Sequence, residues 1–76
     1  MWVRSQDKEK LVNCNEFRIV EGACLLNGKY TIESNHYILG IYDTKAKALE
    51  VLDDIRHYIV HHPLAVYNMP LNEEVD

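Results

Sequence analysis

The chain has 76 residues, an apolar fraction of 47% and a formal net charge of −4, which together predict one small globular domain. The acidic balance argues against binding to a DNA or RNA duplex, because phosphate backbones are recognised by clusters of Lys and Arg. We find no apolar run long enough to cross a membrane and no secretion signal, and we expect reduced cysteines, so a cytoplasmic protein is predicted.

The N-terminal part predicts a hairpin of two short strands. Residues 2–5 and 10–13 contain strand-forming side chains, and the stretch between them is polar. We expect Trp2 to cover one edge of the core.

A second hairpin is predicted next. Polar and apolar residues alternate from residue 16, and the strand is expected to run on to residue 26 with a bend at Gly22. The pair Asn27-Gly28 is the preferred centre of a two-residue type I′ turn, and residues 30–33 form the returning strand.

Residues 37–42 predict the last strand before a change of period. Both of its faces are apolar, which indicates a central position in the sheet or an outer face covered by another subunit.

A helix of about five turns is predicted between Asp43 and Pro63. Thr44 is the expected N-cap, and Pro63 cannot continue the helix. Apolar residues and one histidine recur at helical spacing on one side: Ala48, Val51, Leu52, Ile55, Tyr58, Ile59 and His62.

These elements predict an α+β domain over residues 1–70, with an antiparallel sheet of four to five short strands and one C-terminal amphipathic helix packed on one face. Residues 64–70 are apolar and are expected to form an edge strand, on this sheet or on a neighbour's. Residues 71–76 are an acidic tail that is expected to fray. A thin core and apolar outer surfaces also predict a homo-oligomer.

No catalytic or metal site is predicted. His57 and His61 stand at i, i+4, but the sequence has no Glu between them as in HExxH and no evident third ligand, which favours a solvated pair. Cys14 and Cys24 lack the spacing of metal ligands, and no phosphate loop, nucleophile elbow or acid–base pair is present. We therefore expect no cofactor and no enzymatic activity.

The polar residues suit binding. Arginine can recognise a phosphate and tyrosine can stack on a base, although the same residues also serve as surface ion pairs and core cover. The candidate ligand-binding residues are Arg4, Ser5, Gln6, Arg56, Tyr37, Tyr42 and Tyr67.

Four stretches carry a resemblance over nearly the whole chain. The opening MWVRSQ, the segment Leu39-Gly40-Ile41-Tyr42, the run from Ala48 to Asp53 (ALEVLD) and the closing Tyr67-Asn68-Met69-Pro70 are similar to those of small proteins from Firmicutes genomes, prophages and phages. That resemblance implies a phage or prophage protein acting in the cytoplasm of a bacterial host, and no particular reaction.

Small phage proteins of this kind often counter host defence by binding. By analogy, the leading hypothesis is a homo-oligomeric sponge that sequesters a nucleotide immune signal, either a cyclic nucleotide or an ADP-ribose-derived molecule, as anti-CBASS and anti-Thoeris proteins do. The alternative is an inhibitor or interaction module that binds a host defence protein. A structural accessory protein is the third hypothesis.

Overall fold

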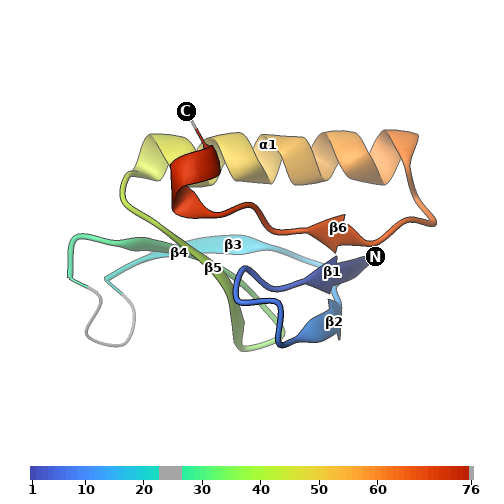
Figure 1. Ribbon diagram of the computed structural model, residues 1–76, viewed down its shortest axis with the longest axis horizontal. Coiled ribbons are helices and arrows are strands. Elements are labelled where there is room, and N and C mark those ends of the chain that lie inside the picture. Colours follow the sequence, from blue (N-terminus) through green and yellow to red (C-terminus); the bar gives the residue numbers. More distant parts are fainter. Residues whose placement is uncertain (23–26, 76) are drawn as a thin grey trace.

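A computed structural model describes residues 1–22 and 27–75. Figure 1 shows one long helix lying above two small groups of strands. The elements in chain order are β1 (Trp2–Arg4), β2 (Leu11–Asn13), β3 (Arg18–Glu21), β4 (Tyr30–Ser34), β5 (Tyr37–Tyr42), α1 (Lys45–His61), β6 (Tyr67–Asn68) and the 3₁₀ turn η2 (Asn72–Glu74). The predicted α+β class, with one C-terminal helix packed on a sheet, is confirmed.

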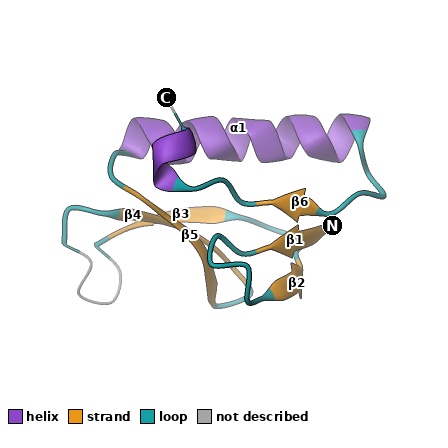
Figure 2. Cartoon of the chain, in the orientation of Figure 1, coloured by secondary structure: helices purple, strands orange, loops and turns teal. Residues whose placement is uncertain are grey.

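The strands form two three-stranded sheets, where the sequence predicted one continuous meander. One sheet has the order β2-β1-β6 and the other the order β3-β4-β5 (Figure 2). All neighbouring strands are antiparallel except β1 and β6, which run parallel with Val3 opposite Tyr67. The predicted edge strand in residues 64–70 therefore forms on the chain's own sheet.

The side chain of Gln6 joins the two sheets. Its amide nitrogen donates to the carbonyls of Ile41 and Pro70, each at 3.1 Å, and its amide oxygen accepts the Ile41 N–H at 3.0 Å. The Gln6 backbone N–H donates to the Leu39 carbonyl at 2.7 Å. The turn after β1 thus covers the exposed edge of β5. The predicted central position of this strand is wrong, because β5 lies at the edge of its sheet; an outer face covered by another subunit stays a prediction.

Helix α1 begins and ends as its caps predict. The Thr44 hydroxyl accepts the Lys47 N–H, and the helix ends at His61, two residues before Pro63. Ala48, Val51 and Ile55 are buried against the sheets. The predicted core-facing side of the helix included two residues that the core does not fully bury, because Leu52 is only half-buried and Ile59 is exposed.

The hairpin of β3 and β4 does not close at the predicted two-residue turn. Glu21 pairs with Tyr30, and the Gly22 N–H donates to the Lys29 carbonyl. The connection is therefore longer than Asn27-Gly28 alone, although Gly28 does adopt the positive φ (76°) that such turns require. The predicted strand continuation over residues 23–26 lies outside the described residues.

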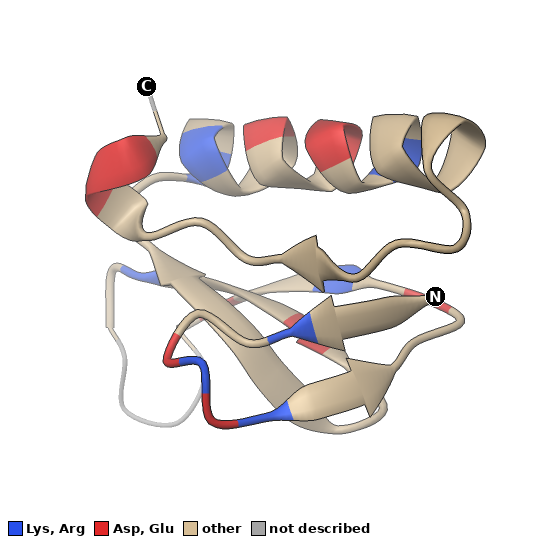
Figure 3. Ribbon diagram, turned by 45° about the vertical axis from the view of Figure 1, so that its right-hand side comes forward, with Lys and Arg blue, Asp and Glu red and all other residues tan. Residues whose placement is uncertain are grey.

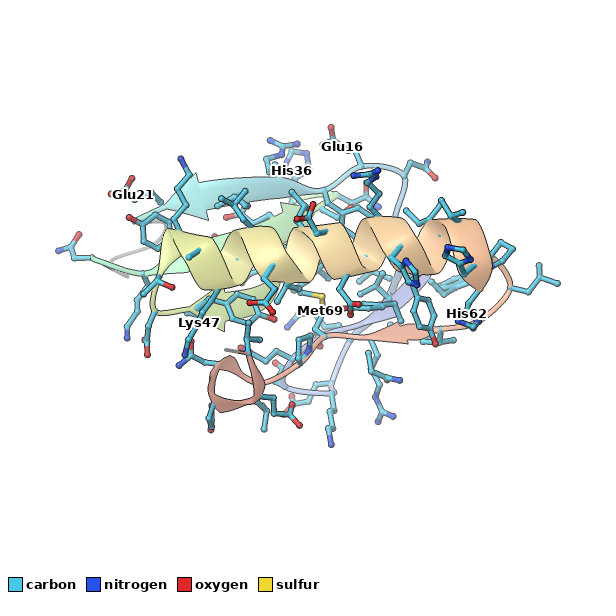
Figure 4. All side chains as sticks on the ribbon, turned by 90° about the horizontal axis from the view of Figure 1, so that it is seen from above. Glu16, Glu21, His36, Lys47, His62 and Met69 are labelled. Carbon is cyan, nitrogen blue, oxygen red and sulfur yellow. The ribbon has the colours of Figure 1, made fainter. Side chains whose placement is uncertain are left out.

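The C-terminal segment packs beside α1 (Figure 4). Asn72 exchanges two hydrogen bonds with Asp43, through the Asp43 N–H and the Asp43 carboxylate, and its carbonyl accepts from Lys47 Nζ. Val75 is buried. Residues 71–75 thus have defined contacts at the start of the helix.

The sequence predicted that Trp2 covers one edge of the core, and this prediction is wrong. Val3 points inward and is fully buried, and the alternation of a strand turns its neighbour Trp2 outward, where 49% of it is exposed.

We expect Ile55→Ala to lower the free energy of unfolding by about 3 kcal/mol, because this side chain is 1% exposed and its removal leaves a cavity. Half-buried Leu52→Ala should cost about 1–2 kcal/mol by the same reasoning. Leu64→Ala, at a fully exposed position, is the control and should leave the midpoint of urea denaturation unchanged. Equal effects at positions 55 and 64 would contradict the packing described here.

A second expectation concerns acid stability. Hydrogen bonds from Lys29 and then Asn72 hold the pKa of Asp43 below its usual range. A depressed folded-state pKa stabilises the protein above the ordinary carboxyl pKa, and this contribution is lost as the pH falls through the folded-state value. Asp43→Asn should therefore lower Tm near neutral pH, and its difference from the wild type should shrink as the pH falls below the ordinary pKa of an aspartate and through the lower folded-state value. A difference that stays constant with pH in thermal melts would contradict this account.

Candidate functional site

The outer face of the β2-β1-β6 sheet is the main candidate binding surface. Because strand side chains alternate, Trp2 and Arg4 point to this face while Val3 points into the core. Arg4 lies opposite Leu11 on one neighbouring strand and Asn68 on the other. An aromatic ring and a guanidinium therefore lie on one exposed surface, about 7 Å apart along the strand.

Two shallow hollows flank Arg4. One, of about 420 Å³, is lined by Lys8, Asn68, Pro70 and Glu74 among others. The other, of about 430 Å³, is lined by Lys8, Lys10, Leu11 and Val66 among others. Both are open to solvent, which makes this surface accessible to a ligand.

Positive charge gathers in the turn between β1 and β2, with acids interspersed (Figure 3). Lys10 lies 3.6 Å from Asp7, whose pKa is held below its usual range by hydrogen bonds from the Ser5 hydroxyl and the Glu9 N–H. Arg4 donates its Nε–H to the Lys8 carbonyl at 3.2 Å. Within the described residues neither Arg4 nor Lys8 forms an ion pair, although Glu74 lines one of the two hollows beside them and Glu9 lines the other.

The side chains of Ser5 and Gln6 form hydrogen bonds with other groups of the same chain. The buried Ser5 hydroxyl donates to Asp7 and accepts the Lys10 N–H at 3.0 Å, which shapes the turn. The Gln6 side-chain amide makes three hydrogen bonds, two with the backbone of Ile41 in β5 and one with the Pro70 carbonyl. Both residues therefore hold the turn that presents Arg4.

Two of the three candidate tyrosines are in the core. Tyr42 is fully buried and donates its hydroxyl to the Pro70 carbonyl at 2.8 Å, and Tyr67 donates to Asp54 at 2.8 Å. Burial raises the pKa of both hydroxyls, and for Tyr67 the Asp54 carboxylate raises it further. Tyr37 is exposed and lines a separate hollow with Leu11.

Arg56 is not brought to Arg4. It lies on the exposed side of α1 and lines a different hollow, with Asp53, His57 and Val60. His57 and His61 stack with ring centroids 4.2 Å apart. Among residues 1–22 and 27–75, no group of three metal-ligating side chains converges on one point.

A groove of about 410 Å³ lies between α1 and the C-terminal segment. Its lining combines four carboxylates with the apolar Val51, Pro70 and Val75; the carboxylates are Glu50, Asp53, Asp54 and Glu74. The concentration of carboxylates makes this groove unsuitable for an anion.

Sequence reasoning missed Trp2 and Lys8 as parts of the candidate surface. The signal for Trp2 was present in the alternation of Trp2, Val3 and Arg4, which places Trp2 and Arg4 together on whichever face Val3 does not take. Lys8 has no such signal, because its position depends on a turn in which Lys8 itself has a positive φ of 66°.

Comparison with protein-family models, with curated proteins and with solved structures found no match to this chain. In the part of the chain that the structure describes, no helix has the length and apolar character needed to cross a bilayer.

We expect Gln6→Ala to lower the free energy of unfolding by about 2 kcal/mol, because it leaves the Ile41 N–H and carbonyl without their partner and removes one of the two donors to the Pro70 carbonyl. Asn13→Ala is the comparison, since within the described residues its amide oxygen accepts from the exposed N-terminal amine alone. Urea denaturation measures both. A Gln6 variant as stable as the wild type would show that the two sheets are held together without this side chain.

Proposed function

We propose that this chain is a non-enzymatic, homo-oligomeric binding protein that sequesters a nucleotide signal on the outer face of its β2-β1-β6 sheet. The proposal narrows the predicted site to Arg4 and adds Trp2 and Lys8. Ser5 and Gln6 take supporting roles, because their polar groups hold the turn.

The observation that carries the proposal is the pairing of Trp2 with Arg4 on one exposed strand face. A nucleotide needs a flat apolar surface for its base and a donor for its phosphate. Trp2 offers the first with half of its surface exposed, and Arg4 offers the second through the guanidinium nitrogens beyond its bonded Nε. The spacing of about 7 Å allows one nucleotide to contact both.

Local charge supports an anionic ligand despite the acidic chain. Arg4 and Lys8 line both of the hollows that flank the strand. Asp7 and Glu9 belong to the same turn, but the Asp7 carboxylate is directed to Ser5, Lys10 and the Glu9 N–H. The resemblance to phage and prophage proteins supports a counter-defence setting, in which the ligand is a cyclic nucleotide or an ADP-ribose-derived immune signal in the host cytoplasm.

A second candidate function is inhibition of a host defence protein. It is favoured by the exposed apolar side chains on and beside this sheet, namely Trp2, Leu11 and Val66, and by Tyr37 in the separate hollow that it shares with Leu11. Exposed tryptophan and arginine side chains on one surface are also typical of the residues that dominate binding energy at protein interfaces.

Trp2 is the only tryptophan, so its fluorescence reports directly on the proposed site. Titration with a panel of cyclic oligonucleotides and ADP-ribose derivatives should quench this emission for one ligand class, with a micromolar or tighter Kd. Arg4→Ala should weaken binding at least tenfold, which corresponds to losing one charge-assisted phosphate contact.

The matched control is Arg18→Ala, an exposed strand arginine that is already paired with Glu16 and should leave the Kd unchanged. If no nucleotide changes the emission or the heat of titration, the sponge proposal fails and the protein-inhibitor candidate replaces it. If a nucleotide binds equally well to the wild type and to Arg4→Ala, the site is elsewhere on the molecule.

A further inference from the structure

We propose that two copies of this chain associate through α1, with the helices antiparallel and a two-fold axis passing between Asp53 and Arg56. The proposal identifies the surface for the self-association in the proposed function, and it does not depend on which ligand binds the sheet. Its contact residues form the Leu49–Val60 stripe, which consists of Leu49, Asp53, Arg56 and Val60.

The stripe is one continuous line on the helix. Its residues recur at i, i+4, i+7 and i+11, the spacing that places side chains on one side of an α-helix. This side faces away from the core residues Ala48, Val51 and Ile55. Figure 4 looks onto the outer side of the helix, which no other element of the described chain covers.

The stripe is apolar at both ends and exposed. Leu49 is 46% exposed and Val60 is 68% exposed, and Ile59 beside them is also exposed. Leu49 and Val60 stand apart on one copy, and the pairing of Leu49 with Val60 of a second copy across a two-fold axis would cover both of them. Asp53 and Arg56 lie between the two ends.

The order of these residues is self-complementary. When two antiparallel helices meet across a two-fold axis between positions 53 and 56, Asp53 of one copy faces Arg56 of the other, and Leu49 faces Val60. Each residue of the stripe therefore meets a partner of matching chemistry. Neither Asp53 nor Arg56 takes part in an ion pair within the described residues, so both are available for this contact.

Charge also favours this face over the other exposed surfaces. Each copy carries a net charge of −4, so two copies repel unless they meet at a locally neutral surface. The Leu49–Val60 stripe has one acid and one base. The neighbouring groove between α1 and the C-terminal segment shares Asp53 with the stripe and is lined by three further carboxylates, Glu50, Asp54 and Glu74, with no Lys or Arg, so two copies of that groove would repel one another.

The length of the helix-to-helix contact indicates how tightly the two copies should bind. Helix α1 has 17 residues and is about 26 Å long. A single helix pair of this length forms an interface at the small end of the stable range, so we expect dissociation in the micromolar range. The solvated ion pairs set the antiparallel register more than they strengthen binding.

Analytical ultracentrifugation of the wild type over a micromolar concentration range should show a monomer–dimer equilibrium. Asp53→Arg and Arg56→Asp should each raise the dimer Kd at least tenfold, because each places like charges opposite one another. Mixing the two single variants should give a heterodimer, and the double variant D53R/R56D should recover a Kd within about threefold of the wild type. Glu73→Lys, a charge change of equal size in η2, is the control and should not alter the equilibrium.

Disulfide trapping tests the direction of the helices. In a Cys24→Ser background, an equimolar mixture of Leu49→Cys and Val60→Cys should cross-link between copies on mild oxidation, whereas neither variant alone should do so efficiently.

A wild type that is monomeric throughout, a dimer insensitive to both charge reversals, or cross-linking of Leu49→Cys to itself in preference to the mixture would each overturn the proposal. Circular dichroism confirms that the variants remain folded. Nucleotide titration of Asp53→Arg measures the sheet site separately, so failure of one proposal is distinguishable from failure of the other.

Discussion

The hydrogen bonds of the Gln6 side chain join the two sheets of this fold. Two sheets of three short strands each have little apolar area, and a small isolated sheet is marginally stable in water. The Gln6 amide replaces the missing strand-to-strand contact between them by bonding both polar groups of Ile41. It also bonds the Pro70 carbonyl, which anchors the segment that follows β6. One polar side chain therefore links three parts of the chain that are distant in sequence.

Local sequence signals predicted the local elements well. The helix follows from its apolar period, the Thr44 hydroxyl and Pro63, all of which act within a few residues. The strands and the antiparallel hairpins follow from alternation and turn residues. The division into two sheets was missed because it depends on contacts between residues such as Val3 and Tyr67, whose pairing leaves no pattern in either segment. The Asn27-Gly28 turn was placed too tightly because turn propensity does not specify how many residues join the strands.

In the candidate site, too, the sequence predicted what depends on local pattern and missed what depends on distant contacts. Arg4 could be singled out from the sequence as a cation near the end of a strand, and it does lie on an exposed face. Residue type alone could not separate Tyr37 from Tyr42 and Tyr67, because tyrosine serves equally in a core and on a binding surface. Residue type also could not show that the Ser5 and Gln6 side chains form hydrogen bonds within the chain. Their partners lie in the turn itself, in β5 and at Pro70. The polar residues next to a candidate ligand group can thus be the ones that position it.

The parallel pairing of β1 with β6 has a kinetic consequence. Val3 meets Tyr67 only after the chain between them closes a loop of more than sixty residues, and this costs about 2 kcal/mol more in entropy than closing the short turn after β1. The β3-β4-β5 sheet and α1 have mainly short connections and form without that penalty. From this penalty we expect the two-residue strand β6 to join the fold last and to detach first. Amide protons of β6 should accordingly exchange with solvent through a local opening that leaves the helix and the second sheet intact.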